Sequence, residues 1–187
     1  MRAHDGCAFS FMNFPKNSIF VVAIFVIAAV FLMQTNVDFF TLNNDAASLV
    51  KKGNYYFNVG GNGRYDLEMA EKYFKKALEI DYLVPDAWHQ LARIDFLRGN
   101  FSDALLKINI QIALHGDSFM ASYYIRGLIY GYSGEYKKAE EDFLKFFDWD
   151  SNNWAVYNDI AWIYFQQGEY EKTRLVAEGG LAYFPDN

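Results

Sequence analysis

The chain has 187 residues, of which 52% are hydrophobic and 21% are charged, a composition of a folded protein with one domain rather than of a disordered one. The formal net charge is −6 at pH 7, which argues against nucleic acid as a partner, because phosphate binding needs a clustered basic surface. Cys7 is the single cysteine, so an internal disulfide framework and a cysteine-based zinc site are excluded.

A long apolar segment follows the short N-terminal segment, residues 1–17. From Asn17 to Val37 no side chain is charged. A helix of that length is about 31 Å long, which equals the thickness of the hydrocarbon core of a bilayer, about 30 Å. We predict an uncleaved transmembrane helix over residues 18–37. A cleaved signal peptide is less favoured, because the pair of small residues expected after its apolar core is missing. A buried soluble helix is less favoured, because the segment has no polar stripe.

The charges on either side of the apolar segment predict its orientation. Arg2 and Lys16 precede it, whereas Asp38 and Asp45 follow it. Because positive charges stay in the cytoplasm, we expect a single-pass membrane protein with a cytoplasmic N-terminus. The remainder, after a short linker at residues 38–44, is then expected on the extracytoplasmic side, in a periplasm or at the cell surface.

The rest of the chain predicts short amphipathic helices separated by tight turns. Residues 66–80 place Leu67, Ala70, Phe74 and Ala77 on one side of a helix, with lysines and glutamates on the other. Further along the chain, glycine is followed by a polar residue at regular intervals, which marks a turn because glycine adopts positive φ without steric cost. These turns begin at Gly99, Gly134 and Gly168.

A set of small and aromatic residues recurs with a period of 34 residues. Tyr157, Ala161, Tyr164, Gly168 and Tyr170 repeat the pattern that is set by Tyr123, Gly127, Tyr130, Gly134 and Tyr136. Earlier copies lie 35 residues before this pattern, from Trp88, and about one period before that, around Ala70. A fixed period of this size indicates a protein built from stacked repeats.

The repeated unit resembles the tetratricopeptide repeat, a helix–turn–helix of 34 residues. The resemblance implies an all-α fold, a right-handed α-solenoid of about four repeats preceded by one transmembrane helix. We place the repeat domain at residues 45–187. The predicted repeats are at about 45–84, 85–119, 120–153 and 154–187.

The resemblance also implies a concave groove, lined by one face of the first helix of each repeat, that binds a protein or peptide partner. Aromatic and arginine side chains on this face are the types that dominate binding hot spots. The alternative is that these aromatic residues pack against the next repeat and leave the groove unoccupied. The register places nine candidate partner-binding residues in this groove: Asn54, His89, Arg93, Phe96, Tyr124, Tyr132, Asn158, Trp162 and Phe165.

Little in the sequence indicates catalysis. The three histidines, His4, His89 and His115, are far apart and none has a partner at the spacing of metal ligands. The glycine-rich stretch at residues 60–63 lacks the Lys-Ser/Thr of a phosphate loop. We therefore predict no catalytic residues, no metal and no cofactor, and a membrane-anchored scaffold rather than an enzyme.

Two alternatives stay open at this point. The last repeat, which ends at Asn187, has no polar capping helix after it, so self-association through this repeat is a second expected contact. The same feature fits a different class of function, the C-terminal portion of a polytopic envelope enzyme such as a polysaccharide ligase or polymerase.

Overall fold

The computed structural model describes residues 45–58 and 65–186. Within these ranges every regular element is a helix, so the predicted all-α repeat fold is confirmed there. None of the helices in the described ranges combines the length and apolarity that crossing a membrane requires. The predicted N-terminal segment, transmembrane helix and linker, residues 1–44, lie outside the described part of the chain.

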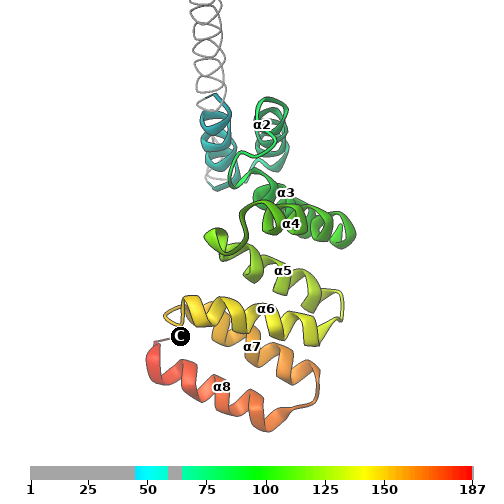
Figure 1. The fold of residues 1–187 in the computed structure, drawn as a ribbon. Coiled ribbons are helices and arrows are strands. Elements are labelled where there is room, and N and C mark those ends of the chain that lie inside the picture. The colour runs from blue at the N-terminus through cyan, green and yellow to red at the C-terminus, as the bar shows by residue number, and fades with distance from the viewer. Residues whose placement is uncertain (1–44, 59–64, 187) are drawn as a thin grey trace, which may run out of the picture. The chain divides into compact units, whose positions relative to one another are not determined.

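The helices follow one another in pairs joined by tight turns, and the pairs stack side by side (Figure 1). Residues 45–58 are helical and precede α2, which is Leu67–Ile80. A short 3₁₀ helix, η1 (Gly116–Phe119), lies between α4 and α5. The other α-helices are α3 (Ala87–Leu97), α4 (Phe101–His115), α5 (Ala121–Tyr132), α6 (Tyr136–Trp149), α7 (Trp154–Gln166) and α8 (Tyr170–Tyr183).

Helix α2 shows how the sequence encodes these elements. Asp66 caps its N-terminus, because its carboxylate accepts a hydrogen bond from the backbone N–H of Met69 at 2.9 Å. Ala70, Phe74 and Ala77 are fully buried, and their spacing of three to four residues places them on one side of the helix. The amphipathic helix predicted at residues 66–80 is therefore confirmed, with Asp66 as its cap.

The turns within the helix pairs depend on glycine. Gly99, Gly134 and Gly168 have φ values of 78°, 80° and 75°, in the left-handed region that other L-residues rarely occupy. Each of these residues follows the first helix of a pair and lets the chain reverse before the second. The turns predicted from the sequence at these glycines are confirmed.

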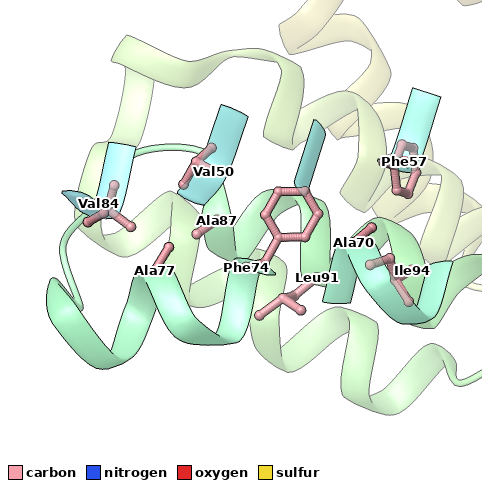
Figure 2. Close-up of a cluster of buried hydrophobic side chains, with 10 residues drawn as sticks. Val50, Phe57, Ala70, Phe74, Ala77, Val84, Ala87, Leu91 and Ile94 are labelled. Atoms are coloured by element: carbon pink, nitrogen blue, oxygen red, sulfur yellow. The ribbon is translucent and has the colours of Figure 1, made fainter. Parts of the chain in front are cut away.

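The hydrophobic core runs between the helices. Its first part joins residues 45–58, α2 and α3, whose buried side chains point toward one another in Figure 2. Val50 and Phe57 from the helical residues 45–58 contribute to it, together with Phe74 from α2 and Leu91 from α3. Two further clusters join α3 and α4 to α5, and α5 and α6 to α7. Each of the first three helix pairs therefore buries its apolar side chains against the next pair.

A small residue of each first helix faces a side chain of the second helix, and this contact differs between repeats. A Cβ atom added to Gly53 would lie 2.5 Å from the ring of Phe74, and one added to Gly127 would lie 2.7 Å from the ring of Phe143. The glycines thus allow the two helices of these two pairs to approach closely. The equivalent positions of the other two repeats hold Ala92 with Ile108, and Ala161 with Ala177.

Candidate functional site

The nine residues predicted to line the groove lie on the first helices of the repeats: residues 45–58, α3, α5 and α7. The surface that these helices form is called the first-helix face below. The structure brings seven of the predicted residues together in three groups rather than in one row. It buries His89 and leaves Phe165 outside the groups.

The first group is polar and joins the helical residues 45–58 to α3. Asn54 Nδ2 donates a hydrogen bond to Oδ2 of Asp86 at 2.9 Å, and Gln90 Nε2 donates to both oxygens of the same carboxylate at 3.1 and 3.2 Å. Arg93 Nη1 donates to Oε1 of Gln90 at 2.9 Å. The guanidinium carbon of Arg93 lies 4.4 Å from the ring centroid of Phe57, within range of a cation–π interaction. A charged donor is thereby held half-buried beside an aromatic ring.

This polar group has two unusual features. Asp86 has φ 76°, and among the described residues it is the only non-glycine residue with positive φ. Such a conformation costs roughly 1–3 kcal/mol, and here it places the carboxylate where it accepts from Asn54 and Gln90. Asn54 Oδ1 is buried without a hydrogen-bond partner among the described residues. Burial lowers the pKa of Arg93, an effect that Asp86 opposes.

The second group is an aromatic row, Phe96, Tyr132 and Trp162, with one residue from each of α3, α5 and α7. The ring centroids of Phe96 and Tyr132 are 5.4 Å apart, and those of Tyr132 and Trp162 are 5.1 Å apart. These separations are typical of stacked and edge-to-face aromatic pairs. The row is therefore one continuous apolar strip across three repeats.

The aromatic row is only partly covered by its own neighbours. Two aromatic rings from second helices flank the row. The ring centroid of Phe101 on α4 is 5.9 Å from that of Phe96. The ring centroid of Tyr136 on α6 is 6.5 Å from that of Trp162. Tyr132, at its centre, is 60% exposed. Phe165 is also exposed, but its ring packs on Tyr170 and not on the row.

The third group joins α5 to α7. The hydroxyl of Tyr124 donates a hydrogen bond to Oδ2 of Asp159 at 2.6 Å, and Asn158 Nδ2 lies 3.4 Å from the other carboxylate oxygen. Burial raises the pKa of Asp159, and the hydrogen bond from Tyr124 opposes this effect. Burial and the neighbouring carboxylate both raise the pKa of Tyr124. The ring of Tyr124 packs on Phe143 and Phe146 of its own repeat, whereas its hydrogen bond to Asp159 links it to the next repeat.

His89 was predicted to face the groove, but it lies inside the stack, with 5% of its surface exposed. Its Nδ1 is 3.1 Å from Oγ of Ser122, and its ring packs edge-on against Phe119 at 5.0 Å. Its backbone N–H donates to Oε1 of Gln111 at 3.3 Å. Gln111 of α4, Phe119 of η1 and Ser122 of α5 therefore enclose this position. Burial lowers the pKa of His89 to about 4.

Three hydrogen-bonding residues of these groups, Asp86, Gln90 and Asp159, were not among the nine predicted ones. Gln90 lies four residues after Asp86, one helical turn, and this spacing could have indicated their contact. Asp159 lies 35 residues after Tyr124, close to one repeat period, which could have indicated a contact between equivalent helices. No group of three or more histidine, cysteine, aspartate or glutamate side chains within residues 45–58 and 65–186 is arranged to hold a metal ion. The groups offer hydrogen-bonding and apolar contacts.

Comparison with known proteins supports the same architecture. The tetratricopeptide-repeat family model matches residues 65–82 and 121–153. A human protein, cilia- and flagella-associated protein 70, is 36% identical over 78 residues, which cover 41% of this chain and 7% of that protein. The chain thus spans a small part of this relative's length.

Solved structures of MamA are similar in fold. A crystal structure of MamA has a TM-score of 0.65 and 24% sequence identity, and the match covers 76% of this chain and 80% of that one. MamA from residue 41 to its end, from Desulfovibrio magneticus RS-1, has a TM-score of 0.66 and 17% identity, covering 77% of this chain and 78% of that one. At these identities the likeness concerns the fold. The family match thus indicates tetratricopeptide-repeat sequence at residues 65–82 and 121–153, and the structural likeness supports an all-helical solenoid fold.

Proposed function

We propose that this protein is a non-enzymatic, membrane-anchored scaffold that binds a segment of a partner protein on its first-helix face. The observation that carries the proposal is the aromatic row of Phe96, Tyr132 and Trp162, which crosses three repeats and keeps Tyr132 60% exposed. Exposed aromatic side chains on a rigid helical support provide a large contact area at low entropic cost.

The polar group beside Arg93 complements this apolar strip. A guanidinium half-buried over Phe57 is a strong donor for a carboxylate or a backbone carbonyl of a bound peptide. The partner that fits is therefore an extended or helical segment with apolar side chains and a carboxylate or carbonyl near one end.

Residues 18–37 serve in this proposal as the membrane anchor, with the repeats on the extracytoplasmic side. The single cysteine, Cys7, is a natural reporter of this topology, because it precedes the anchor. In intact cells, a membrane-impermeant maleimide should leave Cys7 unlabelled until the membrane is permeabilised. Labelling of intact cells would contradict the proposed orientation.

Partner binding is tested with Tyr132→Ala, which removes the exposed ring at the centre of the aromatic row. The matched control is Tyr183→Ala on α8, because Tyr183 is 72% exposed and lies outside the row. Captured proteins are compared by quantitative mass spectrometry after pull-down from solubilised membranes. We expect at least one protein to be depleted about tenfold by Tyr132→Ala and retained by Tyr183→Ala. Identical capture by both variants and the unmodified chain would refute the proposal.

A further inference from the structure

A second apolar surface lies between the last two helices, away from the aromatic row. It is a groove between α7 and α8 with a hollow of about 300 Å³, called the α7–α8 groove below. On each helix the lining residues are three or four positions apart and so share one face. They include Trp154, Tyr157 and Ala161 from α7 and Ala177, Gly180 and Leu181 from α8.

The repeat register identifies what covers the equivalent surface elsewhere in the stack. One period earlier, the same six positions are Met120, Tyr123, Gly127, Phe143, Phe146 and Phe147. These residues lie in or against the core cluster that joins α5 and α6 to the first helix of the next repeat, α7. Val156, Ile160 and Ile163 of α7 fill that surface, at a spacing of three to four residues. The surface of the third repeat that corresponds to the α7–α8 groove is therefore occupied by an amphipathic helix.

The α7–α8 groove differs from its counterpart in the size of its residues. In α6 the floor is made by Phe143 and Phe146, both buried, whereas α8 has Ala177 and Gly180 at these positions. The change from phenylalanine to alanine and glycine leaves the hollow. No residue of α8 is buried, and Leu181 is 52% exposed at the edge of the groove. The groove is thus lined mainly by apolar residues, together with Asn158, and has smaller residues at its floor than the surface that α7 fills.

A second copy of this chain could fill the groove only with a helix face that is not already packed in its own core. Among the described helices the candidate is the outer face of residues 45–58, and it does not suit the groove. The outer face of the helical residues 45–58 exposes Ser48, Lys51 and Lys52, and burying two lysines in an uncharged groove is costly. The apolar stripes of α3, α5 and α7 are already packed in the core clusters. A second copy therefore offers no first helix with a free apolar stripe among the residues that the structure describes.

We propose that the α7–α8 groove binds an amphipathic helix of a partner protein. This helix carries an aliphatic stripe with the spacing of Val156, Ile160 and Ile163, and a bulkier residue at its centre that fills the hollow beside Ala177 and Gly180. Recognition is mainly apolar, because none of the described residues that line the groove is charged and Asn158 is the amide among them. The groove shares Asn158 with the first-helix face but no residue of the aromatic row, so variants at Tyr132 and Ala177 test the two proposals separately.

The test uses a labelled synthetic peptide of residues 151–168, the α7 segment of this chain, with Ile160→Phe as the bulky central residue. A matched peptide carries Ile160→Asp. Binding to the purified full-length chain in mild detergent is measured by fluorescence anisotropy, with empty micelles as the blank. The groove is blocked by Ala177→Phe, and Ala182→Phe is the control, because Ala182 is exposed on α8 but does not line the groove.

We expect the Ile160→Phe peptide to bind at least tenfold more tightly than the Ile160→Asp peptide. Ala177→Phe should weaken binding at least tenfold, and Ala182→Phe should change it less than twofold. Absence of binding, or binding that Ala177→Phe leaves unchanged, would overturn the proposal. A chain that is dimeric by light scattering and becomes monomeric with Ala177→Phe would also overturn it, because the occupant would then be a second copy.

Discussion

Gly127→Ala is expected to destabilise the fold, although alanine is the better helix former. The added Cβ would lie 2.7 Å from two ring atoms of Phe143, closer than any normal van der Waals contact. Phe143 is fully buried, so its ring cannot move into solvent. Overpacking of this kind costs roughly 1–3 kcal/mol, whereas replacing glycine inside a helix gains about 1 kcal/mol. The expected net effect is a loss of about 1 kcal/mol.

The second repeat supplies a rescue for this substitution. At the positions of Gly127 and Phe143 it has Ala92 and Ile108, both fully buried in one core cluster. Combining Gly127→Ala with Phe143→Ile therefore reproduces a pair that this chain already packs. Phe143→Ile alone should leave a cavity and destabilise the fold, because the space beside Gly127 would stay empty. The double variant should be more stable than the sum of the two single effects, by roughly 0.5–3 kcal/mol.

Urea unfolding, followed by circular dichroism at 222 nm, measures all four proteins of this cycle. The midpoints should shift while the slope of the free energy of unfolding against urea stays constant, which identifies a change in stability. A stabilised Gly127→Ala variant would refute the reasoning, as would strictly additive effects in the double variant. Either result would mean that the two helices of this pair are not held at the distance that the structure shows.

Three further predictions concern single residues. Gly179→Ala should raise the free energy of unfolding by about 1 kcal/mol, because the site is helical and its nearest neighbour would be 4.0 Å away; urea unfolding measures it, and a loss of stability would contradict it. Arg126→Met should lower the free energy of unfolding by about 3 kcal/mol in the same assay, because it leaves the buried carboxylate of Asp142 without its partner. In the native protein this carboxylate accepts two hydrogen bonds of 2.7 Å from Arg126. A change below 0.5 kcal/mol, roughly the size of an ordinary surface substitution, would contradict the contact. Burial lowers the pKa of His89 in the folded protein to about 4, so on acidification the histidine of the unfolded chain takes up a proton before that of the folded chain. The free energy of unfolding should therefore fall by about 3 kcal/mol as the pH falls from about 6.5 toward 4. His89→Gln should remove that part of the pH dependence, and an identical pH profile in both proteins would exclude His89 as its source.

The features that sequence reasoning recovered are those fixed within one repeat. A positive φ at Gly99 and Gly134 follows from the local need to reverse the chain between two helices, and a 34-residue register marks these positions directly. The same is true of α2, whose cap and buried side are encoded by Asp66 and by the spacing of Ala70 and Phe74. Local geometry and periodicity suffice for such elements.

The features that it could not recover depend on how one repeat is rotated against the next. His89 and Arg93 are four residues apart on α3 and were assigned to one face, yet residues of α4, η1 and α5 enclose the first, and the second is left half exposed. For Tyr124 and Asp159 the repeat period indicates only that the two residues lie on equivalent helices; their hydrogen bond also depends on this rotation. The α7–α8 groove arises from a missing volume at Gly180, which no periodic pattern of apolar residues reports.

The most direct measurement of the central claim, that the aromatic row holds a partner protein, is site-specific photo-crosslinking in native membranes. Benzoylphenylalanine is introduced at Tyr132, the exposed centre of the row, and in a control at Leu106, which is 61% exposed on α4. The account predicts a discrete crosslinked polypeptide from position 132, identified by mass spectrometry, that position 106 does not give. No crosslink at position 132, or the same products from both positions, would contradict it.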